Sequence, residues 1–473
     1  MKKRTYIWLY LVAIIFMGSC ESVVEDLNID PNNPTSAPAD KVLTATEVAN
    51  ILVHEGEIAR KAGFWSGYFT GEDRQYEAFN EYTVTSGDFD ASWADIYVNV
   101  IRNARVARSE EISGKTDILI AISKVLEAHG ASTAADLWGN VPFTEVGVIG
   151  NNTPNYESQQ DIFQMLQDLL EEAISELENG TIRPSSGSEI HFDGDPNIWS
   201  EVAHTLKARI YMHTKDYEAA YAEAQLGISN AENSLRAVHS DAQDAQNLYY
   251  QLMTGNRGQD ISSDGAFILD LLSENEGDYR GNEKTDERAR FNYYFVTEDN
   301  LVKPNYIDED GFAALDAPFP LISYEENQLI LAEAGVRTQG FETGLDHLNN
   351  YREYLNDGGY ISESFHEDGL MYAPYTSEDF SSGGIENLNG NVSADQALLR
   401  EILEERYITF FGQIEGFNDL RRTREENSVK VPVTPTTGNE LPQRFLYPQS
   451  EIERNPNIPG TIPGFFEPTP VNQ

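Results

Sequence analysis

The sequence is poor in cysteine and in basic residues. Its single cysteine, Cys20, excludes an internal disulfide, a four-cysteine zinc site and an iron–sulfur cluster. Only 33 Lys and Arg stand against 78 Asp and Glu in 473 residues, so the formal net charge is −45. A surface this acidic repels phosphate backbones and anionic lipid headgroups, which makes nucleic acid a poor partner. Hydrophobic residues still make up 40% of the chain, enough to bury a sizeable core and to exclude a disordered protein.

Catalytic motifs are also missing. The chain contains no HExxH, GxSxG, P-loop or GxGxxG motif. With 78 carboxylates, acidic pairs arise on any folded surface, and nothing in the sequence marks one pair as the two carboxyl groups of a glycosidase. The sequence therefore predicts a protein that is not an enzyme and that needs no cofactor.

The N-terminus predicts a removable export signal. Basic residues at positions 2–4 are followed by an apolar run over residues 6–16, which is too short to span a bilayer of roughly 30 Å. The next four residues, Met-Gly-Ser-Cys, resemble the lipobox of bacterial lipoproteins, in which small residues precede an acylated cysteine. We therefore expect a signal peptide over residues 1–19 and a lipid anchor on Cys20. An ordinary signal peptide with a chance cysteine is the alternative.

Helical periodicity dominates the rest of the chain. A Pro- and Asn-rich arm is expected over residues 20–40, because this composition resists helix formation. Apolar residues at helical spacing then predict helices over residues 93–104, 118–137, 161–177 and 394–411.

Two segments resemble each other and predict pairs of helices. Ala208 is followed 12 positions later by Ala220, and Ala332 is followed 12 positions later by Gly344. Each turn between them carries an aromatic residue three positions before the second small residue. Small residues at these positions let two helices cross closely, as in tetratricopeptide repeats. Two accidental helical hairpins are the alternative.

Two long segments interrupt the helical pattern. Residues 231–320 and 356–392 are rich in Gly, Asn, Asp and aromatic residues and show no clear periodicity. Loops of this length inside a compact domain are usually functional. We therefore expect a mostly α fold, a single domain over residues 41–473 in which tetratricopeptide-like helical pairs form the scaffold and two loop-rich insertions interrupt it.

Six segments in order resemble the SusD/RagB family of outer-membrane nutrient-binding lipoproteins. The first reads AADLWGNVPFTE and is similar to the family's DLWGDVPYTEA stretch, and the fifth contains the DLRRT run. Glu287 stands where the family usually has Pro, and Phe417 where Trp is common, at positions that we interpret as structural. The six segments are residues 134–145, 199–209, 286–295, 320–334, 401–423 and 444–455.

The resemblance implies a SusD-like scaffold with a loop-rich ligand face and a membrane partner. Members of the family capture oligosaccharides, or less often peptides, at the cell surface, and cover a SusC-like TonB-dependent transporter like a lid. The resemblance thus implies a lipid-anchored protein of the outer membrane, exposed at the cell surface, that delivers an oligosaccharide or polysaccharide to such a transporter. A peptide-binding lid and a helical-repeat adaptor without a small ligand are the alternatives.

Candidate glycan contacts come from aromatic and polar residues outside the helical stripes. An aromatic ring packs on the C–H face of a sugar, while amide, carboxylate and guanidinium groups bind its hydroxyls. Two segments, residues 64–82 and 249–279, combine these residue types without a clean helical period. We expect Tyr76 to be exposed, whereas Trp65 is equally compatible with a core position. The candidate ligand contacts are Trp65, Tyr68, Asp73, Arg74, Gln75, Tyr76, Asp260, Asp264 and Tyr279.

Other conspicuous residues favour a structural role. Trp93, Trp138 and Trp199 lie in helical or family-framework contexts and are expected in the core. Arg421 and Arg422 are expected to anchor local carboxylates such as Asp419, which follows from the acidity of the chain.

A metal site is not predicted, although one loop begins like a calcium loop. Asp193 and Asp195 have the spacing of calcium ligands, but Ile198 occupies the position where the sharp turn requires Gly, so a solvated loop is favoured. The long loops contain no run of Lys or Arg that would offset the acidity of the chain. A neutral glycan is therefore favoured over a polyanionic one.

Overall fold

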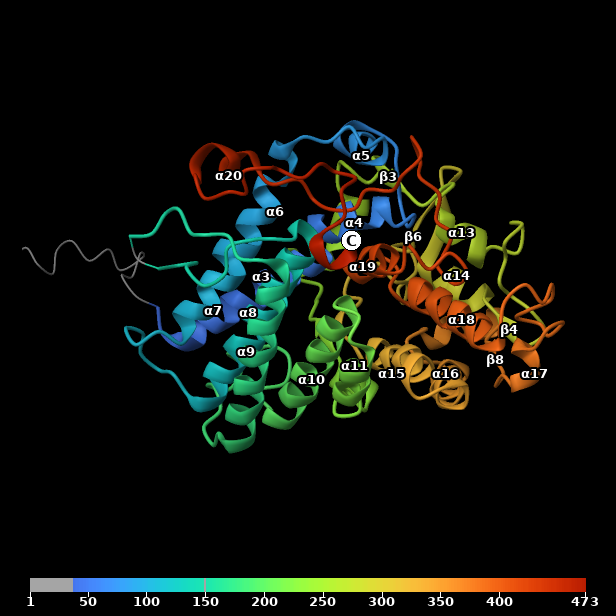
Figure 1. Ribbon diagram of the computed structural model, residues 1–473, viewed down its shortest axis with the longest axis horizontal. Helices are drawn as coiled ribbons and strands as arrows, with labels where there is room; N and C mark the ends of the chain where they lie inside the picture. The colour runs from blue at the N-terminus through green and yellow to red at the C-terminus, as the bar shows by residue number, and fades with distance from the viewer. Residues whose placement is uncertain (1–36, 149) are drawn as a thin grey trace, which may run out of the picture.

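Helices form most of the structure. The computed structural model describes residues 37–148 and 150–473, so the predicted signal peptide, Cys20 and most of the predicted arm lie outside the described residues. The fold is mostly α, as the sequence predicts (Figure 1). The first helix of the described residues begins at Ala39, within the last residues of the expected arm. The long helices are α3 (Ala39–Glu55), α4 (Glu57–Trp65), α8 (Asp117–Trp138), α9 (Gln159–Asn179), α10 (Pro196–His213), α11 (Tyr217–Ala224), α15 (Tyr324–Thr338), α16 (Phe341–Asn356), α18 (Ala394–Thr409) and α19 (Ile414–Arg422).

The predicted single helices form where their periodicity places them, as α8, α9 and α18. Side chains cap them: Thr116 accepts a hydrogen bond from the backbone N–H of Leu119, and Ser158 accepts one from Asp161. Each cap satisfies an N–H group that the first turn of a helix leaves unpaired. The predicted helix at residues 93–104 is continuous but contains a π-helical stretch, η2 (Asp95–Ile101), between α6 (Asp90–Ala94) and α7 (Arg102–Ala107).

The two predicted helix pairs are α10–α11 and α15–α16. Ala208, Ala220 and Ala332 are fully buried where the helices of each pair meet. Gly344 on α16 lies so close to α15 that an added Cβ atom would be 2.5 Å from the Cβ atom of Val336. Small side chains therefore allow the close crossing that the sequence predicts. Because α11 also packs against α15, the two pairs form one tetratricopeptide-like stack.

The two insertions consist of loops that connect short elements. Short elements also occur outside the insertions, and across the described residues the strands pair only in twos, each pair antiparallel: β1–β3, β2–β7, β4–β8 and β5–β6. The short elements are α5 (Arg74–Asn80), α12 (Leu248–Thr254), α13 (Phe267–Leu272), α14 (Arg288–Tyr294), α17 (Ser377–Phe380), α20 (Gln449–Arg454), β1 (Thr70–Gly71), β2 (Leu235–Ala237), β3 (Ile261–Ser262), β4 (Thr285–Asp286), β5 (Phe295–Glu298), β6 (Leu301–Pro304), β7 (Phe319–Ile322), β8 (Met371–Tyr372) and the 3-10 turns η1 (Ser86–Phe89), η3 (Ala231–Asn233), η4 (Glu363–Asp368) and η5 (Pro470–Asn472).

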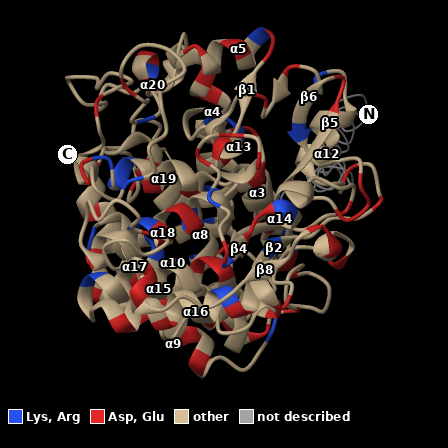
Figure 2. Ribbon diagram, turned by 90° about the vertical axis from the view of Figure 1, so that its right-hand side faces the viewer, with Lys and Arg blue, Asp and Glu red and all other residues tan. Residues whose placement is uncertain are grey.

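Acidic residues are distributed over most elements, with basic residues scattered among them (Figure 2). No helix within residues 37–148 and 150–473 is long and apolar enough to cross a membrane.

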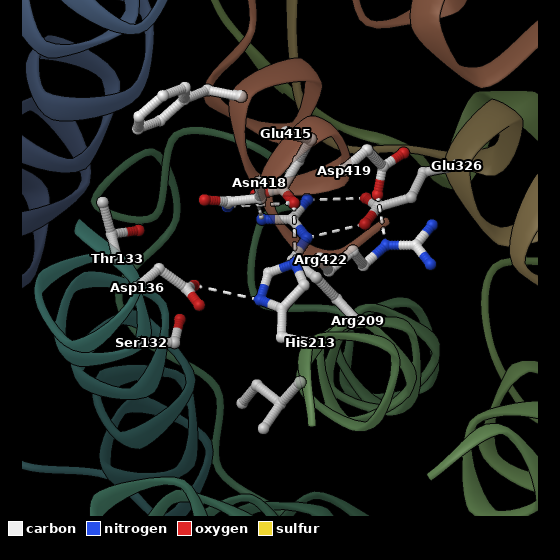
Figure 3. Close-up of polar contacts among 12 residues, drawn as sticks. Ser132, Thr133, Asp136, Arg209, His213, Glu326, Glu415, Asn418, Asp419 and Arg422 are labelled. Atoms are coloured by element: carbon white, nitrogen blue, oxygen red, sulfur yellow. Dashed lines mark hydrogen bonds and ion pairs between the residues drawn. The ribbon is translucent and has the colours of Figure 1, made fainter. Parts of the chain in front are cut away.

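A cluster of charged side chains lies inside the helical scaffold (Figure 3). His213 on α10 lies between two carboxylates, with Nδ1 3.0 Å from Asp136 on α8 and Nε2 2.9 Å from Glu415 on α19. Burial by itself lowers the pKa of His213, but the two carboxylates outweigh it and raise the pKa to about 10. The charged imidazole therefore joins three helices that are distant in sequence.

Arg209, one turn before His213, extends this cluster to two further helices. Its Nε and Nη2 atoms each lie 2.6 Å from a carboxylate oxygen of Glu326 on α15, and Nη1 lies 3.0 Å from Nε2 of His129. His129 stacks on His54 from α3, with ring centroids 3.6 Å apart. Burial lowers the pKa of His54 to about 4 and that of His129 well below its usual range, so these two rings are neutral.

The residues predicted to be structural are buried. Trp93, Trp138 and Trp199 lie in the core, as predicted. Arg422 donates to Asp419 at 2.7 Å, which confirms its predicted anchoring role. Arg421 is structural too, but it donates to backbone carbonyls and to the side chain of Asn418, not to a carboxylate.

Candidate functional site

Two loop segments that are distant in sequence meet at the strand pair β1–β3. Thr70 lies opposite Ser262 in this pair, and the N–H of Glu72 donates to the carbonyl of Asp260 at 2.8 Å. These contacts place the start of α5 beside the turn that precedes β3. The structure thus brings together candidate residues from both segments that the sequence singles out.

Asp260 holds two arginines at this junction. Nη1 of Arg74 lies 3.1 Å and Nε of Arg257 2.7 Å from the same carboxylate oxygen. The Arg257 guanidinium also lies 4.9 Å from the centroid of the Tyr76 ring. Among the residues that the structure describes, Nη2 of Arg257 has no hydrogen-bond partner. Because Asp260 is only 2% exposed, it positions the two guanidinium groups and does not itself face a ligand.

Arg74 is the more exposed of the two arginines at this junction. Its side chain is 56% exposed, and its φ of 56° lies in the left-handed region that non-glycine residues rarely adopt. Asp73 caps α5 and accepts the N–H of Arg74 at 2.8 Å, which helps to hold this conformation. Asp73, Arg74 and Gln75 are all exposed and present a carboxylate, a guanidinium and an amide to solvent.

Three of the four aromatic candidates lie in the core, and the prediction that Tyr76 is exposed is wrong. Trp65 and Tyr68 are fully buried, and Tyr76 is 3% exposed. Nε1 of Trp65 donates to the carbonyl of Phe79 at 3.1 Å, and the Tyr68 hydroxyl donates to the carbonyl of Tyr407 at 2.6 Å. In this conformation none of the three rings offers a face to a sugar. The ring of Trp65 packs against Phe89, Phe417, Phe445 and Phe465.

These rings are buried because the segment that appeared aperiodic contains two short helices. On α4, Ile58, Ala62 and Trp65 follow a spacing of four and three and face the core. On α5, Tyr76 and Phe79 are three residues apart and are both buried. When the segment is divided into two short helices, its aromatic residues fall at helical spacing. This spacing is the signal in the sequence that predicts a core position for these rings.

Asp264 and Tyr279 lie in two different places. Asp264 is exposed next to β1–β3, and its carbonyl accepts a hydrogen bond from Thr70 Oγ1 at 2.8 Å. Tyr279 is half-buried and does not join that group. Its hydroxyl accepts the N–H of Glu287 at 3.3 Å, immediately before α14. Burial raises the pKa of Tyr279.

A groove beside Tyr279 contains residues that the sequence analysis did not select. It has a volume of about 350 Å³ and lies where the chain leaves α13 next to α14. Phe291 provides a partly exposed ring, while Asn275 and Asn292 provide amides. Arg288 is 51% exposed and is held by Asp286, with Nη2 2.5 Å from Oδ2. One ring, two amides and a guanidinium make the combination expected for a sugar-binding groove.

The pattern of buried and exposed residues on α14 indicates that one side of this helix faces the groove. Ala289, Arg290 and Tyr294 are buried on one side of the helix, whereas Phe291 and Asn292 are partly exposed. In the sequence, residues 286–295 resemble one framework segment of the family, so the outer side of α14 is not predicted.

We call the exposed parts of these two neighbouring regions the ligand face. It comprises Asp73, Arg74 and Gln75, Arg257, Asp264, Tyr279 and the α13–α14 groove. In Figure 1, α5, β3, α13 and α14 all lie in the upper right half of the molecule.

The weak calcium candidate is occupied by protein groups. Oδ1 of Asp195 accepts the N–H of Asn197 at 3.0 Å as the N-cap of α10, and Oδ2 lies 2.8 Å from Nη2 of Arg183. Oδ1 of Asp193 accepts the N–H of Gly187 at 3.1 Å. Within the described ranges, no group of three or more His, Cys, Asp or Glu residues is placed to hold a metal ion.

Comparison with known families gives one match. Residues 31–448 match the SusD-like family model described as "Starch-binding associating with outer membrane". No curated protein matches the chain.

Solved structures share this fold over most of the chain. A SusD/RagB family protein from Bacteroides thetaiotaomicron is 20% identical, with a TM-score of 0.69, covering 92% of this chain and 99% of its own. A chitin-binding SusD homolog from Flavobacterium johnsoniae is 17% identical, with a TM-score of 0.66, covering 92% and 97%. An outer-membrane protein from Bacteroides vulgatus, described as "probably involved in nutrient binding", is 17% identical, with a TM-score of 0.63, covering 92% and 100%. At these identities the likeness establishes the fold.

Proposed function

Because this chain belongs to the SusD-like family, we propose that it is a lipid-anchored cell-surface protein that captures a glycan and delivers it to a SusC-like TonB-dependent outer-membrane transporter. The family match and its outer-membrane description support the location. The predicted lipobox at Cys20 supplies the anchor. The protein acts by binding and hand-over, without catalysis.

The observation that carries this proposal is the chemistry of the α13–α14 groove. Phe291 packs on the C–H face of a sugar ring, and Asn275 and Asn292 exchange hydrogen bonds with its hydroxyls. Arg288 keeps a fixed direction through Asp286 and donates its remaining N–H groups to the same ring. Asp73, Arg74, Gln75 and Asp264 contact further units of the chain.

A neutral glycan suits this face better than a polyanion. Glu274 and Asp368 line the groove together with Arg288, whose charge is already paired with Asp286. The chain as a whole carries a charge of −45. Sulfated or uronic-acid polymers would meet repulsion at this face, while uncharged hydroxyl-rich polymers would not.

Affinity electrophoresis tests the proposal. The full chain, purified in detergent, is run through gels that contain starch, glycol chitin, laminarin or alginate. We expect at least one neutral polysaccharide to retard it, and Phe291→Ala to weaken that retardation about 3- to 10-fold. Phe466→Ala is the matched control, because Phe466 is an exposed ring, 41% accessible, outside the ligand face.

Two outcomes would overturn the proposal. One is that none of the neutral polysaccharides retards the protein. The other is that Phe291→Ala and Phe466→Ala migrate like the unmodified chain in every gel.

A further inference from the structure

A second groove, on the helical scaffold, has the chemistry of a sugar-binding site. It lies between α9 and α10 and has a volume of about 410 Å³, within the range of roughly 300–1,000 Å³ that small-molecule sites occupy. It contains no residue of the ligand face. In Figure 1, α9 and α10 lie at the lower left, whereas α13 and α14 lie at the right.

Three glutamines of α9 form one wall of this groove. Gln160, Gln164 and Gln167 follow a spacing of four and three, so they share one side of the helix. Gln160 and Gln164 are exposed, while Gln167 is 5% exposed. A row of planar amides with both donors and acceptors matches the hydroxyls of a sugar chain.

Gln167 has an unused acceptor in this groove. Its Nε2 donates to the carbonyl of Lys207 on α10 at 3.1 Å, which fixes the amide. Its Oε1 is buried and has no hydrogen-bond partner among residues 37–148 and 150–473. Buried polar atoms normally have a partner, and leaving one without costs free energy. A small shift of this amide toward the groove would bring the acceptor within reach of a sugar hydroxyl.

An aromatic ring forms the opposite wall. Tyr211 on α10 is partly exposed, lines the groove, and packs against a hydrophobic cluster formed by α10, α11 and α15. Its carbonyl accepts the N–H of Asp216 at 2.9 Å and the hydroxyl of Thr214 at 3.2 Å, so the backbone that carries the ring is fixed. A half-exposed tyrosine opposite a row of amides is suited to stacking under a sugar.

The groove has an acidic rim. Asp161 and Asp216 line it, and no Lys or Arg does so in the described part of the chain. Anionic sugars would therefore be repelled here, as at the ligand face.

We propose that the α9–α10 groove is a second glycan-binding site, which takes neutral sugar units of the polysaccharide that the ligand face captures. This inference rests on the proposed function. Two sites on separate parts of one molecule raise the affinity for a long polymer through multivalency, whereas a short oligosaccharide fills them one at a time.

Calorimetric titration with short oligosaccharides tests this second site. The full chain is titrated with the hexasaccharides of starch, chitin and laminarin, and any that binds should do so with about two molecules per chain. Tyr211→Ala should reduce this to about one, and so should Phe291→Ala, because each removes one stacking platform. The double variant should bind none. Tyr211→Phe keeps the ring and serves as the matched control, and thermal melting of each variant confirms folding.

The outcomes separate this inference from the proposed function. Binding of one molecule that Phe291→Ala abolishes and Tyr211→Ala leaves unchanged overturns the second site and keeps the ligand face. Binding of one molecule that only Tyr211→Ala abolishes supports the α9–α10 groove and overturns the ligand face. If none of the three hexasaccharides binds, both proposals fail.

Discussion

The charged groups of the helical scaffold and those of the ligand face are arranged in opposite ways. Inside the scaffold, the polar atoms of His213 and Arg209 contact carboxylates and other buried side chains. On the ligand face, Arg74 and Arg288 are each held by a carboxylate but remain more than half exposed. The same ion-pair chemistry thus fixes helices in the one region and presents directed donors to solvent in the other. The difference lies in burial, since an exposed guanidinium keeps N–H groups that a ligand can reach.

The largest effect should come from breaking a buried network. Glu333 on α15 binds Arg422 at 2.6 and 2.5 Å and Arg406 at 3.2 Å. Glu333→Ala leaves Arg406 and Arg422 with Asp419 as their one shared carboxylate partner and should lower the free energy of unfolding by about 3–5 kcal/mol, as measured by urea denaturation. Glu172→Ala, which removes an exposed partner of Lys124, should cost about 0–1 kcal/mol. An equal loss in the free energy of unfolding for the two variants would contradict the difference between buried and exposed ion pairs.

A comparable loss should follow from truncating Trp65, which the sequence analysis had placed among the ligand contacts. Trp65→Ala removes a fully buried ring and should cost about 3–5 kcal/mol in urea denaturation. At temperatures where the variant stays folded, its glycan affinity should equal that of the unmodified chain. A loss of affinity without a loss of stability would return Trp65 to the ligand face.

Because of the two buried histidine systems, the free energy of unfolding should decrease at both acidic and alkaline pH. The pKa of His213 is raised to about 10, so its stabilising contribution is complete below about pH 6.5 and is lost as the pH rises toward 10. The pKa of His54 is lowered to about 4, so its contribution is present above about pH 6.5 and is lost as the pH falls toward 4. Urea denaturation between pH 4 and 10 measures both flanks.

Replacing one of the two histidines should remove the loss of stability on one side of the pH profile only. His213→Gln should flatten the loss of stability between about pH 7 and 10 and leave the acidic side unchanged. An unchanged alkaline flank in this variant would show that His213 is not charged in the folded protein.

The smallest change in stability is expected on the ligand face. Arg288→Ala removes a side chain that is 51% exposed and should shift the free energy of unfolding by less than about 1 kcal/mol. Its effect should be seen in glycan affinity instead, measured by the same retardation assay. Arg288→Lys keeps the charge but not the planar fork, and should restore only part of the affinity.

The scaffold could be predicted from the sequence because its determinants are local. The apolar stripes of α8 and α9 repeat at helical spacing, and the small residues Ala208, Ala220, Ala332 and Gly344 identify the two helix pairs. These patterns need no knowledge of which segments meet in space.

The candidate site could be predicted only in part because its determinants are not local. Arg74 and Asp260 are 186 positions apart, and only the β1–β3 pairing brings them together. Trp65 is buried by rings from near the C-terminus, so its own neighbours in sequence say little about its exposure. Phe291 was passed over because it shares a short helix with buried framework residues.

The packing of Trp65 also sets the order in which the molecule can be completed. Its ring, on the second described helix, is enclosed by Phe417, Phe445 and Phe465. A chain that emerges from its N-terminus first therefore leaves this ring incompletely covered until nearly all of it has been synthesised. The hydrophobic interior around the ring is complete only when the C-terminal segment packs over the beginning of the chain.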